Sequence, residues 1–326
     1  MKLPHRGQVL HLVASAAALP AVSRIARAQA YPTHPVRILV GFAAGGTSDI
    51  VGRLLSQWLS ERLGQQFIVE NRPGASTNIA TEAVARAAAD GYTLLLIGGV
   101  NTINATLFDK LSFDFLRDIA PVASVFETPL VVEVNPSVPV HTIPEFITYA
   151  KDNVGKLNMG TPGVGTPPHV AGELFKMMAG VDMVHVPYRG TGPMLTDLIG
   201  GQVQVAFDPL PASIEHIRAG KLRALAVTTA SRSDALPGIP SASESVPRYV
   251  ASNWYGFAAP KNTPPEIVGK LNAEINAALA DPKMRARLAE LGGTSFANSP
   301  TDFAKFVADD TAKWAKVIRA ANIKPQ

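Results

Sequence analysis

The chain has 326 residues, a formal net charge of +4 at pH 7 and no cysteine. A single domain usually holds about 100–200 residues, so this length predicts roughly two domains, each with its own core. The absence of cysteine excludes disulfides, thiol catalysis and cysteine-bound metals.

The first 30 residues have the composition of an export signal. Lys2 and Arg6 precede a short apolar run over residues 12–22, and residues 28–30 (AQA) have the small-x-small form that signal peptidases accept. The run is far shorter than the ~20 apolar residues that a membrane-spanning helix needs. We therefore expect cleavage after Ala30 and a periplasmic location.

The charge balance argues against large anionic partners. Residues 1–30 contain four basic and no acidic residues, so their removal lowers the net charge from +4 to 0. Nucleic acids and anionic membranes are bound through many Lys and Arg contacts, which a neutral chain lacks. We expect no nucleic acid partner, and any bound anion should be small and locally recognised.

Residues 31–120 alternate apolar strands with helical periodicity, the pattern of an α/β domain with a largely parallel sheet. The pattern predicts strands over residues 36–42, 66–70 and 92–97, and helices over residues 50–63 and 79–89. Each strand runs into a loop rich in Gly, Asn, Ser or Thr. Ligands of open α/β sheets bind over these carboxyl ends, so we expect the site there.

A second α/β unit follows a proline-bounded stretch, in which residues 130–134 are a predicted crossing strand. The pattern predicts further strands over residues 157–160, 203–207 and 222–228, and helices over residues 143–150, after residue 166 and around residues 194–199. On the second of these helices, Met177 and Met178 continue an apolar face and are expected in the core. Residues 253–260 are predicted to cross back, followed by helices over residues 264–280 and 301–320. We expect domain 1 to comprise residues 31–130 and 251–326, and domain 2 residues 131–250.

Two glycine-rich helix entrances carry the functional argument. Residues 37–49 (RILVGFAAGGTSD) run from a strand into a Gly-Gly turn and a helix start, and a related layout returns at residues 157–169 (LNMGTPGVGTPPH). Free N–H groups at such helix starts bind small anions. Thr47 and Thr166 are the predicted N-caps, and Asp49 either caps its helix or also accepts a hydrogen bond from a ligand. Two such helix starts, each half of an anion-binding site, predict that the protein closes on its ligand like a clamp.

Cofactor and catalytic motifs are not found. No glycine loop is followed by the Lys of a phosphate-binding loop, and Gly163-Val164-Gly165 lacks the third glycine of a dinucleotide fingerprint. There is no G-x-S-x-G elbow, and His169 and Glu173 share a helix face without a third metal ligand nearby. We therefore expect no cofactor, no metal and no catalytic residue.

Several segments together resemble one protein family. FAAGGTSD, NRPGAS, DGYTLL, GTPGVGTPPH, VPYRGTGP and QVAFDP, in this order, are similar to solute-binding proteins of the tripartite tricarboxylate transporter family, also called Bug proteins. The resemblance covers nearly all of the mature chain. It implies an α/β, two-domain type II periplasmic binding protein (Venus flytrap) fold with a hinge. It also implies closure on a small carboxylate held mostly by main-chain amides and ordered water.

The resemblance also implies the ligand-binding residues, which all lie in the loops that follow strands. They are Phe42, Gly45, Gly46, Thr47, Asp49, Asn101, Asn104, Gly163, Gly165, Thr166, His169, Tyr188, Arg189, Gly190 and Asp208. Alternatives remain open for three of them: His169 as a cap or packing residue, Tyr188 as a buried ring and Arg189 as a surface charge. Many relatives carry proline before the Gly pair, where this chain has Ala43 and Ala44.

The leading hypothesis is a non-enzymatic, monomeric periplasmic receptor that captures a small carboxylate and delivers it to a membrane permease. A second hypothesis is a ligand sensor that presents its closed form to a membrane signalling partner. A third is an exported enzyme that acts through Asp49, His169 and Asp208. Amide donors read charge and geometry, so citrate, an aromatic acid, an amino acid and a neutral amide all remain compatible as ligands.

Overall fold

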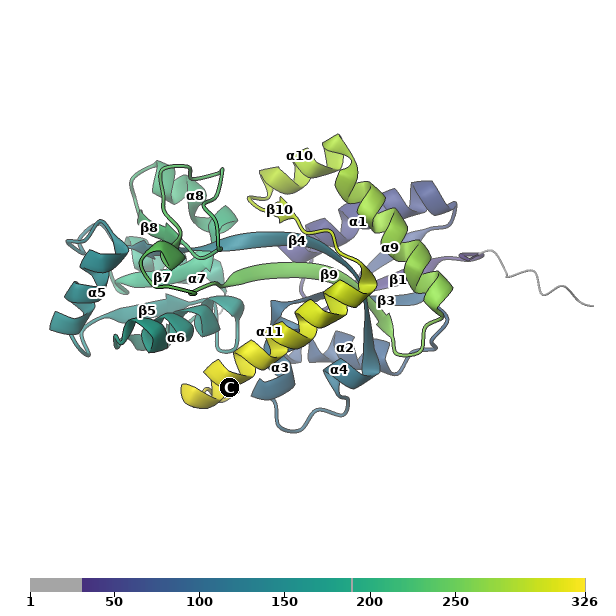
Figure 1. Ribbon diagram of the computed structural model, residues 1–326, viewed down its shortest axis with the longest axis horizontal. Coiled ribbons are helices and arrows are strands. Elements are labelled where there is room, and N and C mark those ends of the chain that lie inside the picture. The colour runs from purple at the N-terminus through teal and green to yellow at the C-terminus, as the bar shows by residue number, and fades with distance from the viewer. Residues whose placement is uncertain (1–30, 189, 326) are drawn as a thin grey trace, which may run out of the picture.

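The computed structural model describes residues 31–188 and 190–325, which form two α/β lobes side by side (Figure 1). The predicted export signal, residues 1–30, lies outside the described residues. Strand β4 (Ile119–Val134) runs through both lobes and belongs to both sheets. In the described part of the chain, no helix is both long and apolar enough to cross a membrane.

The first lobe is built on the strand order β2-β1-β3-β9-β4, with β10 added to β4. Its strands are β1 (Val36–Val40), β2 (Phe67–Asn71), β3 (Thr93–Gly98), β9 (Ser252–Pro260) and β10 (Thr294–Ser295). Strands β2, β1 and β3 are parallel, and β9 is antiparallel to both β3 and β4. The predicted alternation of strands and helices therefore yields a mixed sheet.

Side chains alternate between the two faces of the first-lobe sheet. Ile38 and Leu96 pack with α1 (Thr47–Leu63), α9 (Pro265–Ala280) and α10 (Pro282–Glu290). Leu39 and Leu95 point to the other face, which is covered by α2 (Asn78–Ala85), α4 (Phe115–Asp118) and the start of α11 (Pro300–Ala320). A period of two places successive side chains of a strand on opposite faces, so both faces are apolar and covered.

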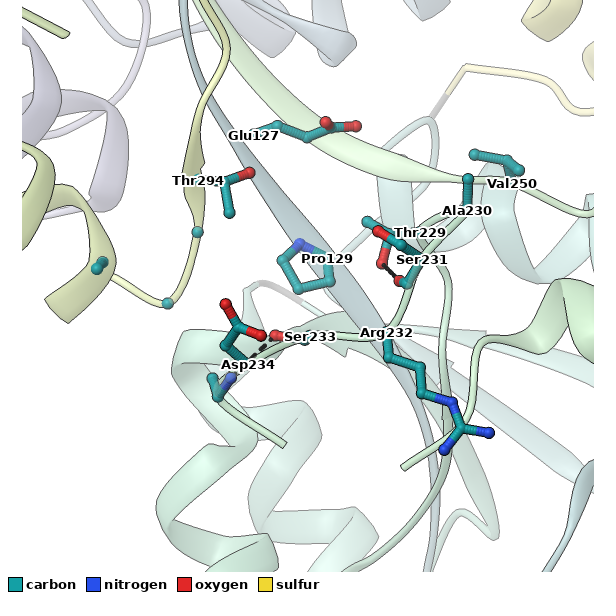
Figure 2. Close-up of a pocket in the computed structure, with 14 residues that line it drawn as sticks. Glu127, Pro129, Thr229, Ala230, Ser231, Arg232, Ser233, Asp234, Val250 and Thr294 are labelled. Carbon is teal, nitrogen blue, oxygen red and sulfur yellow. Dashed lines mark hydrogen bonds between the residues drawn. The ribbon is translucent and has the colours of Figure 1, made fainter. Parts of the chain in front are cut away.

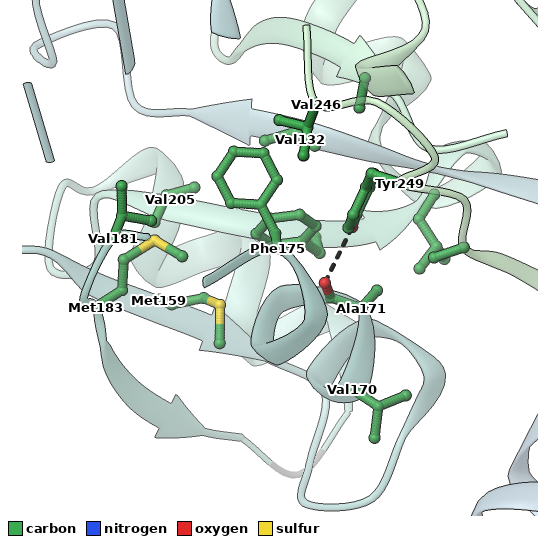
Figure 3. Packing of buried hydrophobic residues seen from close by; sticks show 14 of the residues in the cluster. Val132, Met159, Val170, Ala171, Phe175, Val181, Met183, Val205, Val246 and Tyr249 are labelled. Carbon is green, nitrogen blue, oxygen red and sulfur yellow. Dashed lines mark hydrogen bonds between the residues drawn. The ribbon is translucent and has the colours of Figure 1, made fainter. Parts of the chain in front are cut away.

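The second lobe is built on β4, β7, β5 and β6, with β8 on the other side of β4. Its elements are α5 (Ile143–Asp152), β5 (Asn158–Thr161), α6 (Pro167–Ala179), β6 (Val184–Pro187), α7 (Thr191–Ile199), β7 (Val205–Pro209), α8 (Leu210–Arg218) and β8 (Arg223–Val227). Phe175 of α6 packs between strand residues such as Val132 and the ring of Tyr249 (Figure 3). The Tyr249 hydroxyl donates to the carbonyl of Ala171 at 3.0 Å, so this buried phenol is satisfied.

Helix α11 connects the two cores (Figure 1). Phe303 in its first turn packs in the first lobe. Trp314 and Ile318 in its second half pack with the second-lobe core, together with Ile103 and Leu107 of α3 (Gly99–Leu107). The C-terminal helix therefore spans the junction between the lobes.

Two local predictions are wrong. Helix α1 has Gly46 at its N-cap and Thr47 as its first residue, because Gly46 takes the extended conformation that precedes the helix. Met177 and Met178 are 48% and 39% exposed. Helix α6 is buried through Ala171 and Phe175 instead, so the two methionines in its last turn lie outside the core.

Candidate functional site

The strand register brings the carboxyl ends of both sheets to the junction of the lobes. Gly98, the last residue of β3, pairs with Tyr255 of β9, which pairs with Phe126 of β4. Pro209, the last residue of β7, pairs with Leu130 of β4. These two points on β4 are four positions apart, or about 13 Å at ~3.3 Å per residue. The loops after β1 and β3 therefore face the loops after β5 and β7.

The two lobes approach each other at the helix entrances of α3 and α6. A Cβ added to Gly165 would overlap the side chain of Leu107, and one added to Gly99 would lie 3.5 Å from Cγ of Pro167. Gly165 has φ +72°, a conformation that favours glycine. The second glycine-rich turn is thus pressed against the first lobe.

Hydrogen bonds to Asp49 hold the first glycine loop in place. One carboxylate oxygen of Asp49 accepts from the Gly45 N–H at 2.9 Å, and the other accepts from Nδ2 of Asn71 at 3.0 Å. Arg53 donates to both oxygens at 3.1 Å, and this hydrogen bond is the main reason why the pKa of Asp49 is lowered. Asp49 is buried and its oxygens are engaged by the chain itself, an arrangement that fixes the loop geometry.

A turn with strained backbone, residues 75–77, contacts this loop. Ala75, Ser76 and Thr77 all have positive φ, at 45°, 51° and 75°. Such backbone costs about 1–3 kcal/mol per residue and clusters at ligand sites. A Cβ added to Gly41 would meet Cβ of Thr77 at 2.5 Å, so the two turns touch. Ser76 and Thr77 were not predicted for the site, because a non-glycine residue carries no signal of positive φ.

Helix α3 contributes two predicted site residues, both buried. Oδ1 of Asn101 accepts from the Gly98 N–H at 2.9 Å and so caps this helix start. Nδ2 of Asn104 donates to Oδ1 of Asn78 at 3.2 Å. Oδ1 of Asn104 and Nδ2 of Asn78 are buried and have no partner among the residues that the structure describes. They are therefore an acceptor and a donor available at the base of the strained turn.

The second glycine loop is held by Thr166 and His169. Thr166 is the N-cap of α6, as predicted, and its hydroxyl donates to the carbonyl of Gly163 at 2.7 Å. Nδ1 of His169 accepts from the Gly165 N–H at 3.1 Å, and its ring stacks on His185 with centroids 3.8 Å apart. Burial lowers the pKa of His169 to about 3, so the ring is neutral near pH 7. His169 therefore shapes this loop as a hydrogen-bond acceptor.

The loop after β6 is also held by hydrogen bonds within the chain. The Tyr188 hydroxyl donates to Asp197 at 2.7 Å, and burial is the main cause that raises its pKa to about 12. Gly190, with φ +109°, donates its N–H to the carbonyl of Pro162 at 2.9 Å and is the N-cap of α7. Arg189, also predicted for the site, lies outside the described residues.

Asp208 is the second-last residue of β7 and is fully buried. Its Oδ1 accepts from the Thr191 hydroxyl at 3.2 Å, and its Oδ2 lies 3.1 Å from Oγ of Ser213. Ser213 also contacts Oε1 of the fully buried Glu133 at 2.8 Å. Burial raises the pKa of Asp208 to about 7 and raises that of Glu133 as well. A lone Glu inside the apolar strand LVVEV is a sequence signal for this pair, which was not predicted.

A separate cavity of about 500 Å³ lies at the same junction (Figure 2). Glu127 and Pro129 of β4 form its floor, the segment 229–235 forms one wall, and the segment around Thr294 forms the other. None of the predicted ligand residues lines it. This cavity is distinct from the facing glycine loops.

Comparisons with known proteins agree with this geometry. The family model described as tripartite tricarboxylate transporter family receptor matches residues 51–323. Protein BugT of Bordetella pertussis is 36% identical over 300 residues, which are 91% of this chain and 92% of that protein.

Two solved structures with named ligands are also similar. A structure from R. palustris with adipate has a TM-score of 0.80 at 38% identity and covers 91% of this chain and 100% of that one. MatC from Rhodopseudomonas palustris with bound malate has a TM-score of 0.76 at 32% identity, covering 88% and 100%. Such neighbours are two-domain Venus flytrap proteins, which confirms the predicted fold class.

Proposed function

The chain belongs to the tripartite tricarboxylate transporter receptor family, and from this we propose that it is a periplasmic receptor that closes its lobes on a small carboxylate. The observation that carries the proposal is the register that sets the glycine loops after β1 and β5 on opposite sides of one junction. The similar structures with adipate and malate support dicarboxylates as the first ligands to test.

The proposed chemistry is anion capture by main-chain N–H groups. Gly46 and Thr47 open α1, so free N–H groups of its first turn border the junction, whereas α6 begins with Pro167 and Pro168, which carry no N–H. Hydrogen bonds to a charged group contribute about 1.5–3 kcal/mol each, so three or four of them reach the ~8 kcal/mol of micromolar binding if ordering costs stay small. Asp49 and His169 hold their loops in place before the ligand arrives, which lowers that cost.

We further propose that the lobes correspond to residues 31–130 with 251–326 and to residues 131–250, with β4 and β9 as the crossing segments. The second half of α11 would then belong to the first domain by this division, although it packs with the second-lobe core. The mature protein, cleaved after Ala30, would deliver its ligand to a membrane permease. It is proposed to act as a receptor and not as an enzyme.

Titration of the tryptophan fluorescence with a panel of dicarboxylates tests the capture step. We expect saturable binding in the micromolar range and a rise in melting temperature, because a ligand that binds only the folded state stabilises it. Trp254 is buried in β9 next to Gly99, so its emission should respond to closure. If no member of a wide panel of carboxylates binds, the receptor proposal fails.

Deletion of the gene tests delivery. Loss of carboxylate uptake is the expected result. Normal uptake together with a lost transcriptional response would contradict delivery and favour the sensor.

The hydrogen bonds between Asp49 and the first glycine loop yield a specific prediction. Replacing Asp49 by alanine frees the Gly45 N–H and Asn71, so the loop must be ordered by the ligand itself. We expect affinity to fall about tenfold, the size of one lost charge-assisted hydrogen bond. Isothermal titration calorimetry measures the change.

The matched control is Glu82→Ala, which breaks an exposed i,i+4 ion pair with Arg86 away from the loop. It should leave affinity unchanged. An Asp49→Ala variant with the affinity of the wild type would reduce Asp49 to a helix-capping role.

A further inference from the structure

A buried pair of carboxyl groups lies behind the start of α7. Glu133 on β4 pairs with Ala206 of β7, and Asp208 of β7 pairs with Val131 of β4. The two carboxyl side chains are thus diagonal neighbours on one face of adjacent strands. Ser213 of α8 lies between them, with its Oγ 2.8 Å from Glu133 and 3.1 Å from Asp208. All three side chains are fully buried.

The number of hydrogens available in this cluster shows that one of the two carboxyl groups must be protonated. A serine hydroxyl has one hydrogen and can donate to only one of the two carboxyl groups. The second short contact would join two lone pairs unless one carboxyl group is protonated and donates to Oγ. The pair therefore holds at least one proton.

The hydrogen-bond partners assign this proton to Glu133. Asp208 also accepts from Thr191 at 3.2 Å, so two hydroxyl donors can stabilise its charge. Oε2 of Glu133 is buried without a partner in the described part of the chain. A buried charge without donors is far more costly than a neutral acid, so Glu133 is the neutral member.

We propose that neutral Glu133 donates to Ser213, that Ser213 donates to Asp208, and that the pair takes up a second proton when an anionic ligand binds. This inference rests on the proposed function. Asp208 lies directly below Thr191, the first residue of α7, so its negative charge opposes an anion held at the junction. Bringing the anion close favours protonation of Asp208. Glu133 and Ser213 are positioning residues, because they act through Asp208.

The charged groups on the surrounding elements are engaged elsewhere or lie apart. Arg223 of β8 donates to the carbonyls of Val138 and Val140. Asp197 of α7 accepts from Tyr188, and Glu215 pairs with Arg218 on the exposed side of α8. The remaining ionisable side chain of α8 is that of His216, about one turn after Ser213. Arg189, just before α7 in the sequence, lies outside the described residues.

The first experiment follows unfolding of the ligand-free protein from about pH 5 to about pH 8. Glu133 has a pKa raised by burial, so its contribution to stability is complete below its unfolded pKa of about 4.3 and is lost as the pH rises. Glu133→Gln keeps the shape of the neutral acid and cannot ionise. We expect the melting temperature of Glu133→Gln to gain steadily on that of the wild type as the pH rises, and the control His216→Gln to show no such gain.

A pH-independent difference between Glu133→Gln and the wild type would overturn the assignment of the proton to Glu133. When both proteins also carry Ser213→Ala, the gain in melting temperature from Glu133→Gln should be smaller. The hydrogen-bond chain from Glu133 to Asp208 is then broken.

The second experiment titrates malate and adipate by calorimetry in two buffers of different ionisation enthalpy. We expect net proton uptake near pH 7 in the wild type, and affinity that falls about tenfold as the pH rises from about 6 to about 8. Asp208→Asn should bind without proton uptake and with a flat pH profile. Binding by the wild type without proton exchange would overturn proton-linked capture. If neither acid nor any other carboxylate binds, the proposed function fails, while the unfolding series still decides where the proton lies.

Discussion

Replacing Gly165 by alanine is expected to weaken ligand binding by about tenfold or more while both lobes remain folded. The new Cβ would overlap the side chain of Leu107, the last residue of α3, across the junction of the lobes. Overpacking of this kind costs about 1–3 kcal/mol. We expect these two segments to part when the lobes open, so that the cost falls on the closed form and appears in the affinity for any ligand that requires closure. Calorimetric titration of the best carboxylate measures it.

Two variants separate this clash from backbone strain. Gly180 also has positive φ, at +63°, but a Cβ there would meet nothing within 4 Å, so Gly180→Ala carries the strain without the clash. It should keep the affinity of the wild type. Adding Leu107→Ala to Gly165→Ala removes the obstacle and should recover most of the loss. Equal affinities for Gly165→Ala and the wild type would show that closure does not bring these segments together.

Replacing Asp310 by alanine is expected to cost about 3 kcal/mol in the free energy of unfolding. Its Oδ2 accepts from the Thr102 hydroxyl at 2.7 Å and from Nε1 of Trp254 at 3.0 Å, which ties α11 to α3 and β9. Lys313 lies 3.9 Å from the other oxygen. Alanine leaves the buried Nε1 of Trp254 without an acceptor and Lys313 without its counter-charge, whereas the Thr102 hydroxyl can still donate to the carbonyl of Gly99 at 2.8 Å. An orphaned buried donor costs about 1–3 kcal/mol, and more for a charged group. Urea unfolding followed by tryptophan emission measures the loss.

Asp310→Asn is the matched control, because it keeps an acceptor of the same shape and removes only the charge. It should lose clearly less than Asp310→Ala. A loss below about 1 kcal/mol for the alanine variant would mean that water replaces the carboxylate, since water-mediated hydrogen bonds are nearly as favourable as direct ones.

Much of the fold was accessible from local patterns. The predicted strand over residues 36–42 contains β1, the predicted strand over residues 92–97 covers β3 except for its last residue, and the predicted helix over residues 50–63 is most of α1. Periodicity identifies these elements because their buried faces repeat at the period of the structure. Helix α3 was missed, because it begins immediately after β3 and is rich in Asn and Thr, which favour turns as readily as helices. Helices α8 and α10 were missed too, although each has proline at its first turn.

The candidate site was accessible only in part. The glycine turns and the Thr166 cap follow from residue types at fixed short spacing. The strained turn at Ser76 could not be predicted, because its positive φ is imposed by surrounding contacts. The Glu133–Ser213 contact joins residues 80 positions apart, and no short-range pattern records such a distance.

The sequence by itself determined the alternation of strands and helices, the two glycine-rich helix starts and the near-neutral charge of residues 31–326, because these depend on residue type and local spacing. Only the tertiary structure decided that the two turns face each other, that Gly165 meets Leu107 and that Glu133 shares a hydroxyl with Asp208. Those relations are set by the register of β4 against β7 and β9, strands more than 70 residues away along the chain. Pairing over such separations is selected by burial of the whole sheet and not by any short segment.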